Sequence, residues 1–433
     1  SVCPFRAAAG GGGVSKGVAV AEGKKGIHRA WLIMVGCCIL QGCALGCLMN
    51  SGGIFFVPVC DDLGFDRGAF SLYLTFYFIA TTFTYPFVAK FLPKWNFRAF
   101  LSGCVIVLGV TWALMGSFSE LWQFYVAGVV LGIAGALVFV VASTVLIENW
   151  FADKRGTALG IAMCGSGIGG FVFPIIGNMM LETIGWRMTY VAFAVIMCVM
   201  ILPWSLFVFR LHPEELGLKP YGAEKMAEKA GAEEKTSGIP AKKAIFTLAF
   251  VCIFLYAGIE ALFSGYNNHL PGFAESLGYS AAFGAGILSL AQLGYSVATL
   301  VMGWVTDRIG VAASTYITLG ITALSLVGFC LFQSEVPLMV AAFVFGMNSV
   351  IITISVPTLI SEIFGKKYFA QILSYSRMSG IIGCFGAAAV GACYDMTGSY
   401  VGSFVAGVVI LAICAVLVGV ALSQKKKMRA RWE

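Results

Sequence analysis

The sequence predicts an all-α integral membrane protein of twelve transmembrane helices, arranged as two pseudo-symmetric six-helix bundles. Of its 433 residues, 59% are hydrophobic and 11% are charged, and the mean hydropathy is +0.90. Soluble domains carry about 25% charged residues, so a water-soluble chain could not hide this much apolar surface. The apolar residues fall in runs of roughly 20, the length of a helix that crosses the hydrocarbon core. Because backbone groups in lipid must bond within their own segment, each run is predicted to be helical.

Twelve such runs follow one another, and one long polar segment divides them six and six. The strict alternation of a transmembrane β-barrel strand is not seen in them. The predicted spans are 30–57, 69–92, 98–117, 121–148, 156–181, 187–210, 244–268, 281–306, 312–332, 336–361, 369–393 and 400–423. The predicted domains are a disordered cytoplasmic tail at 1–28, an N-terminal bundle at 29–210, a cytoplasmic linker at 211–243, a C-terminal bundle at 244–424 and a basic cytoplasmic tail at 425–433.

The distribution of positive charge predicts the orientation in the membrane. All but three of the 28 lysines and arginines lie in the two tails, the linker and alternate loops, and the exceptions are Arg67, Arg187 and Arg377. Lys and Arg gather in cytoplasmic loops, so both termini are predicted to be cytoplasmic. The same rule accounts for the net charge of +7 without a nucleic-acid partner. A plasma or inner membrane is the expected location.

The two halves share residues at a spacing of about 214, which favours duplication over chance similarity among Gly-rich helices. Parallel repeats of this kind place a binding site near the midplane between the halves. The matching segments are Leu63-Gly64-Phe65 with Leu277-Gly278-Tyr279, Glu148 with Glu362, and Ser166-Gly167 with Ser379-Gly380.

Two charged residues, Glu260 and Arg377, lie well away from the ends of their predicted spans, and intramembrane charges are functional candidates because burying them in lipid is costly. Arg377 lies about eight residues into the eleventh span, roughly 12 Å from the cytoplasmic edge. Glu260 lies in the outer half of the seventh span. Burial there favours its neutral form, so Glu260 is a candidate proton carrier or a partner for a substrate amine. A structural arginine and a glutamate facing an outer vestibule are the alternatives.

Uncharged polar residues in the spans could orient a small molecule, with aromatic rings boxing its apolar part. Core packing is the alternative for each one taken singly. Tyr77 and Tyr295 are the preferred pair because their spans flank the expected central site. The other candidates are Gln41, Gln292 and Asn348.

Other function classes find little support. The 14 cysteines lie mostly in apolar runs and are expected to pack as small residues. His28, His212 and His269 are too dispersed for a metal cluster, so neither a metal nor a cofactor is expected. No nucleophile–base pattern or phosphate loop appears, so an enzyme is not predicted. Oligomeric state is not predicted.

One loop motif carries a family resemblance. The eight residues Gly303 to Gly310 follow the eighth span and fit G-x-x-x-D-R-x-G, a pattern that resembles the major facilitator superfamily, as do twelve helices in two sixes. Gly303 would let two helices approach closely, and Asp307 could accept hydrogen bonds from the start of a neighbouring helix. In the family that neighbour is the fifth span, which begins here near Gly156. The resemblance implies a cytoplasmic conformational latch, which holds the outward-open state. Its residues are Gly303, Asp307, Arg308 and Arg155.

A second stretch, from Trp150 to Gly170, resembles the W-F-x-x-[KR]-R signature and Gly-rich helix of the monocarboxylate and oxalate:formate exchanger branch. That branch implies that Arg377 binds a substrate carboxylate. The sequence also departs from it, because the stretch from Leu290 to Thr299 in the eighth span lacks the expected arginine. One cation instead of two disfavours a dicarboxylate.

The leading hypothesis is therefore a secondary active transporter that moves a small organic anion by alternating access, as proton symport or anion exchange. Its expected partners are that anion, the lipid bilayer and either protons or a counter-anion. A carrier of an organic cation or amphiphile that uses Glu260 is the first alternative. A membrane nutrient sensor that binds without transporting is the second.

Overall fold

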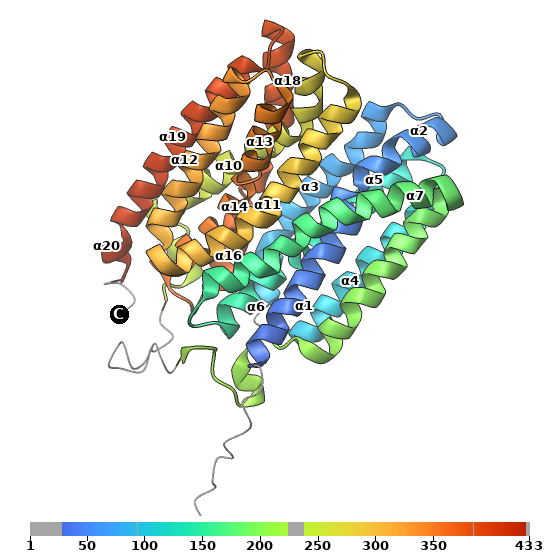
Figure 1. Cartoon of the computed structure of the whole chain (residues 1–433). Helices are drawn as coiled ribbons and strands as arrows, with labels where there is room; N and C mark the ends of the chain where they lie inside the picture. The colour runs from blue at the N-terminus through green and yellow to red at the C-terminus, as the bar shows by residue number, and fades with distance from the viewer. Residues whose placement is uncertain (1–27, 93, 224–237, 384, 430–433) are drawn as a thin grey trace, which may run out of the picture.

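The computed structural model describes residues 28–92, 94–223, 238–383 and 385–429, and this part of the chain is built from helices, with two isolated backbone bridges (Figure 1). The first half contains α1 (Arg29–Ala44), η1 (Leu45–Asn50), η2 (Gly52–Phe55), α2 (Phe56–Leu63), α3 (Arg67–Phe91), α4 (Phe97–Met115), α5 (Leu121–Ala136), η3 (Leu137–Val141), α6 (Ala142–Trp150), α7 (Arg155–Pro203) and η4 (Trp204–Val208).

The second half follows a short connecting segment that includes η5 (Pro213–Leu216) and α9 (Ala241–Ala244). Its elements are α10 (Leu248–Ser276), α11 (Ala281–Ile309), α12 (Val311–Leu331), α13 (Glu335–Phe345), α14 (Asn348–Val350), η6 (Ile351–Ser355), α15 (Val356–Phe364), α16 (Phe369–Arg377), α17 (Gly380–Gly383), α18 (Gly386–Thr397), α19 (Val401–Ser423) and α20 (Lys425–Arg429).

These elements make twelve crossings, as the sequence predicts. Nine continuous helical stretches in the described residues are long and apolar enough to span a membrane. The stretch at 155–208 counts once but holds two crossings, because Gly185 breaks it with a φ of 74°. The shorter apolar stretch Leu72–Val88 lies in α3 and adds one crossing. The remaining crossing, the eleventh along the chain, is formed by α16, α17 and α18 together.

The eleventh crossing differs from the predicted continuous helix at 369–393. Its α16 ends at Arg377, and the short α17 and α18 follow. Glycines make this irregular path possible by allowing close approach to α10: a Cβ on Gly383 or Gly386 would collide with the backbone at Ala261 or Leu262. The first crossing is likewise interrupted at Ser51, between η1 and η2.

The helices repeat at the spacing seen in the sequence. The starts of α3, α4, α5, α6 and α7 each have a counterpart 214 residues later, at the starts of α11, α12, α13, α15 and α16. Even the π-helical segments correspond, since η3 begins at Leu137 and η6 begins at Ile351. A π-helical turn carries an extra residue and is uncommon, so its recurrence at the same register is strong evidence for duplication.

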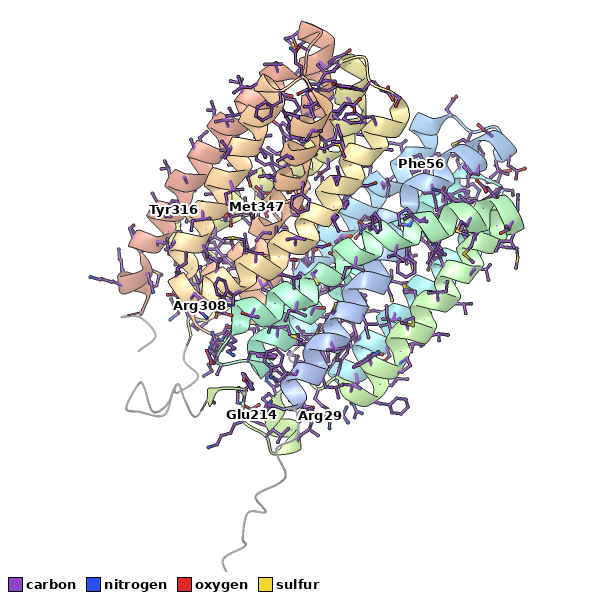
Figure 2. The ribbon with its side chains drawn as sticks, in the orientation of Figure 1. Arg29, Phe56, Glu214, Arg308, Tyr316 and Met347 are labelled. Carbon is purple, nitrogen blue, oxygen red and sulfur yellow. The ribbon has the colours of Figure 1, made fainter. Side chains whose placement is uncertain are left out.

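The halves meet along two lines of contact. Helix α7 packs against α11, and α16 packs against α3. Arg29 and Arg308 lie at the same end of the molecule, with α20, and Phe56 lies at the other end (Figures 1 and 2). We call the end with Arg29 and α20 the terminal face. The predicted tail at 1–28 falls almost wholly outside the described residues, as do much of the linker at 211–243 and the end of the tail at 425–433.

Candidate functional site

Arg377 is a buried charge of the second half. It closes α16, and its side chain is only 7% exposed. Its Nη2 donates to the carbonyl oxygen of Ile352 at 2.8 Å, while its Nε is buried without a hydrogen-bond partner. None of the acidic side chains that the structure describes forms an ion pair with it. A guanidinium buried in this way has donors free for an anionic ligand.

The carbonyl that Arg377 reaches belongs to the π-helical segment η6. A π-helical turn is wider than an α-helical turn and often occurs at functional sites. The equivalent segment η3 of the first half contacts α16, and η6 contacts α7, so each π segment faces the opposite half. The two segments therefore bring irregular backbone to the contact between the halves, and Arg377 at the end of α16 bonds to η6 there.

Two tyrosines from different halves interact electrostatically with Arg377. They are Tyr85 of α3 and Tyr295 of α11. The Tyr295 hydroxyl also meets the hydroxyl of Ser166 in α7, which donates across the interface at 3.1 Å. Together these groups form a polar cluster of one cation and three hydroxyls, drawn from α16, α3, α11 and α7.

Sequence reasoning missed Tyr85 and selected Tyr77, which lies two helical turns earlier and is buried. Tyr77 interacts electrostatically with Tyr85 rather than with Arg377. The missed signal was the spacing in α3, where Tyr73, Tyr77, Thr81 and Tyr85 recur every four residues. Residues at this spacing lie on one face of a helix, so the stripe extends toward Arg377.

Three other predicted residues lie apart from this cluster. Gln41 is fully buried within the first half, where its Nε2 donates to Ser143 Oγ at 2.7 Å. Asn348 starts α14, and its Oδ1 accepts from Ser349 at 2.7 Å while its Nδ2 has no partner. Gln292 is half-buried on α11, near Gly167 of α7. These residues lie on three different helices, and the hydrogen bonds described for Gln41 and Asn348 go to partners other than Arg377.

Glu260 lies inside the second bundle rather than at the interface. Its side chain is 4% exposed, and its Oε2 has no hydrogen-bond partner. The groups that interact with it electrostatically are Tyr256 on its own helix and Cys414 on α19. It does not interact with Arg377, so the two charges do not form a joint site for a zwitterion in this conformation.

Asp307 joins the halves near the terminal face. Its Oδ1 accepts from the backbone N–H of Gly156 at 2.7 Å. Its Oδ2 accepts from the N–H of Thr157 at 2.7 Å and from its hydroxyl at 2.6 Å. Gly156 and Thr157 are in the first turn of α7, where backbone N–H groups lack partners within the helix and the helix dipole favours an anion. Gly303 is required beside this contact, because a Cβ there would collide with the carbonyl oxygen of Gly156.

The other two predicted latch residues, Arg308 and Arg155, make separate contacts. Arg308 places its guanidinium over the Trp304 ring, 4.6 Å from the centroid, and so turns away from Asp307. Arg155 instead pairs with Glu148 at 3.1 Å within the first half. Its Nη1 also donates to Ser361 of the second half at 3.4 Å, and Ser361 Oγ donates to Glu148. Sequence reasoning did not foresee this second bridge.

The side-chain hydrogen bonds described above between the two halves lie between the terminal face and the level of Ser166 and Tyr295. They are those of Asp307, Ser361, Arg155 and Tyr295. The structure is therefore closed on the side of the terminal face.

The comparison with protein families matches this architecture. A family model described as the Major Facilitator Superfamily matches residues 37–385 and 283–431. The chain belongs to the major facilitator superfamily. Among solved structures, this major facilitator chain resembles the fucose:proton symporter FucP of E. coli with a TM-score of 0.64 at 15% identity, over 91% of this chain and 99% of FucP.

Relatives of this superfamily member are transporters by name. It is 28% identical to the MFS-type transporter hasB of Aspergillus fumigatus over 289 aligned residues, and this alignment covers 65% of this chain. The match spans only 62% of that relative's length. It is 24% identical over 400 residues to monocarboxylate transporter 13 of Rattus norvegicus, covering 90% of this chain and 88% of the relative. The protein is thus a multi-pass membrane transporter of the major facilitator type.

Proposed function

We propose that this transporter carries a small, monocarboxylate-like organic anion, and that Arg377 binds the carboxylate. The observation that carries the proposal is the buried Arg377 with no acidic partner among the described residues and an unpartnered Nε. An unpaired charge in the membrane interior is costly, and a substrate carboxylate would offset that cost. The planar guanidinium can pair with both carboxylate oxygens.

The surrounding groups suit the rest of such a substrate. Tyr85 and Tyr295 lie beside Arg377, so their rings can contact an acyl group while their hydroxyls donate to the carboxylate. The relatives named monocarboxylate transporters 12 and 13 support the same substrate class. Alternating access would proceed by opening the contacts of Asp307 and Ser361, with both termini on the cytoplasmic side. The proposal includes either proton symport or anion exchange.

Thermal unfolding of the purified protein with a panel of small carboxylates tests the proposal. A ligand that binds the folded state raises the melting temperature by mass action. We expect at least one carboxylate to stabilise the wild type but not Arg377→Gln, and to stabilise Arg377→Lys weakly because lysine lacks the planar fork. Arg187→Gln is the matched control, since the Arg187 side chain is exposed and pairs with Asp62 rather than with the groups around Arg377. A carboxylate shift of wild-type size in Arg377→Gln would refute this role of Arg377.

A second candidate function rests on Glu260, whose buried and unpartnered Oε2 could attract an organic cation. Under this hypothesis, cationic ligands should raise the melting temperature of the wild type but not that of Glu260→Gln. They should raise the melting temperature of Arg377→Gln as much as that of the wild type. The same panel with organic cations added distinguishes the two candidates.

A further inference from the structure

A groove crosses the outer surface of the first bundle, away from the candidate substrate site. Helices α3 and α4 each pack against α5 but have little contact with one another among the described residues, and the space between them is a groove of about 800 Å³. Its lining includes Ile133 of α5 and Leu137 of η3. Ligand sites in proteins have volumes in this range.

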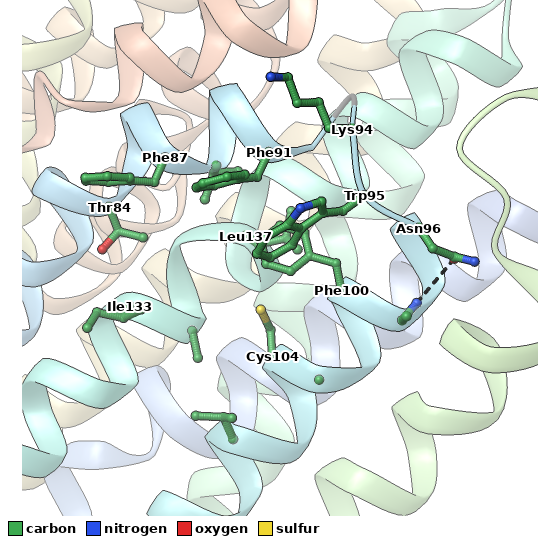
Figure 3. Close-up of a pocket in the computed structure, with 15 residues that line it drawn as sticks. Thr84, Phe87, Phe91, Lys94, Trp95, Asn96, Phe100, Cys104, Ile133 and Leu137 are labelled. Atoms are coloured by element: carbon green, nitrogen blue, oxygen red, sulfur yellow. Dashed lines mark hydrogen bonds between the residues drawn. The ribbon is translucent and has the colours of Figure 1, made fainter.

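The walls of this groove are apolar and aromatic. Phe87, Phe91 and Trp95 lie in a row along one side (Figure 3). Phe91 and Trp95 stack with centroids 4.6 Å apart, and Trp95 meets Phe100 edge-on at 5.1 Å. Trp95 is 52% exposed, as expected for a residue at the membrane interface.

The groove has the depth of one membrane leaflet. Trp95 is near the end of α3 at the terminal face, and Val107 lies ten residues into α4. At 1.5 Å per residue, those ten residues extend roughly 15 Å, which is half of the hydrocarbon core. A single acyl chain of that leaflet would run along it.

The end of the groove at the terminal face adjoins a polar hollow. Trp95 and Asn96 line both the groove and a neighbouring hollow of about 280 Å³. That hollow is also lined by Arg98, Arg210, His212 and Glu215, and Lys94 lies at the end of the groove itself. Arginine and lysine outnumber acids there, so the hollow favours an anion.

The basic groups of the hollow lack a full set of counter-charges. The Arg210 guanidinium donates to the backbone carbonyl of Phe209 at 3.0 Å, and Arg98 donates to the carbonyl of Leu206 at 3.1 Å. Neither forms an ion pair with an acidic side chain in the part of the chain that the structure describes. Burial, followed by the nearby charges of Arg98 and Arg29, lowers the pKa of Arg210, and Glu215 opposes this shift. An added anion would relieve the repulsion between these cations.

From the continuity of the apolar groove with the basic hollow, we infer that the first bundle binds an anionic phospholipid there. One acyl chain lies in the groove between α3 and α4, and the acidic headgroup lies in the hollow between Lys94, Arg98 and Arg210. Basic pockets at the ends of transmembrane helices recognise acidic lipid headgroups in this manner.

One groove residue makes the inference directly testable. A Cβ built on Gly103 meets no atom within 4 Å, so a leucine there starts in open space and extends into the groove that Gly103 lines. Gly320 on α12 is equally open and exposed, and is the matched control in the second half. Both changes replace a mid-helix glycine with a better helix former, so their intrinsic effects on stability are alike.

The experiment measures quenching of Trp95 fluorescence in vesicles. The full-length protein is reconstituted with phosphatidylcholine or phosphatidylglycerol brominated on the upper part of one acyl chain. The Trp95 signal is the difference between the protein and its Trp95→Phe variant. We expect the ratio of Trp95 quenching by phosphatidylglycerol to quenching by phosphatidylcholine to be roughly five or greater in the wild type. In Lys94→Gln/Arg210→Gln that ratio should fall toward one. Lys366→Gln/Lys367→Gln removes two charges from the loop before α16 and should keep the preference.

Gly103→Leu should lower quenching by phosphatidylglycerol, and Gly320→Leu should leave it unchanged. Ala99→Leu fills the same groove from the neighbouring turn and replaces Gly103→Leu if that variant does not fold. Equal quenching by both lipids would overturn the inference, because it means ordinary boundary lipid. Absence of Trp95 quenching would also overturn it, because another protein surface would then cover the groove.

Discussion

The carboxylate of Asp307 accepts a hydrogen bond of 2.7 Å from the backbone N–H of Gly156, and this contact joins the last turn of α11 to the first turn of α7. We predict that Asp307→Asn weakens the closed state, since the amide loses the charge and presents an NH₂ group to one of the two N–H donors. Hydrogen bonds to charged groups contribute about 1.5–3 kcal/mol. Amide exchange at 155–160, followed by mass spectrometry, should therefore accelerate by about tenfold or more.

Arg308→Gln is the control for that experiment, because Arg308 stacks on Trp304 and takes no part in the Asp307 contact. Unchanged exchange at 155–160 in Asp307→Asn would show that the contact does not stabilise the closed state.

Close glycine packing between α7 and α11 leads to a second prediction. A Cβ on Gly303 would overlap the carbonyl oxygen of Gly156, so Gly303→Ala should separate the helices and destabilise the protein by about 1–3 kcal/mol. Gly286 lies on the same helix with open space around it, so Gly286→Ala should be neutral or slightly stabilising. Thermal unfolding of both variants checks this, and equal melting temperatures would contradict it.

The twelve crossings could be predicted from sequence because hydropathy and the placement of Lys and Arg respond to the bilayer itself. The contact between Asp307 and the start of α7 has a similarly local cause, since an anion and a helix N-terminus attract wherever they meet. Their role as a latch stays a prediction, as do the domain boundaries.

Other features depend on how the two halves pack, which hydropathy does not encode. Residues 369–393 read as one continuous apolar run, yet packing against α10 breaks it after Arg377. The π segments η3 and η6 have no composition signal. Hydropathy places Glu260 within the seventh span but does not say which way its side chain points, and in the structure it interacts with Cys414 of α19. The roles of Arg377 and the tyrosines likewise stay predictions.

The hydroxyl contact between Tyr295 and Ser166 supplies a third prediction. It is the deepest hydrogen bond found between the halves in the described residues, at 3.1 Å. Tyr295→Phe and Ser166→Ala should each lower the free energy of unfolding, and the double variant should lose less than their sum by about 0.5–1.5 kcal/mol. A double-mutant cycle on unfolding measures this coupling. Strict additivity would indicate that the two hydroxyls do not interact.

A pH-dependent prediction concerns Asp62 of α2, the helix that begins with Phe56 at the end of the molecule opposite the terminal face. Hydrogen bonds from the Arg187 guanidinium, at 2.5 Å, and from the Trp186 indole lower the pKa of the Asp62 carboxyl. A depressed carboxyl pKa stabilises the folded state above the ordinary value of about 3.9, and this contribution is lost as the pH falls through the folded-state pKa. The melting temperature of Arg187→Gln should thus lie slightly below that of the wild type at neutral pH, and the gap should close in acid. Asp62→Asn should remove the same pH dependence.

Glu260 supplies the last prediction, which separates proton symport from anion exchange. Its carboxyl is buried and its Oε2 has no partner, so Glu260→Gln preserves shape and should leave the fold intact. If Glu260 carries the coupled proton, the variant should lose accumulation driven by a pH gradient in proteoliposomes, because glutamine cannot release a proton. Exchange of labelled for unlabelled carboxylate should persist, because exchange needs no net proton movement. Glu335→Gln at the start of α13 is the control. Retained proton-driven accumulation in Glu260→Gln would exclude Glu260 as the proton carrier and assign that role to another group. Exchange without proton-driven accumulation in the wild type itself would favour an anion-exchange mechanism.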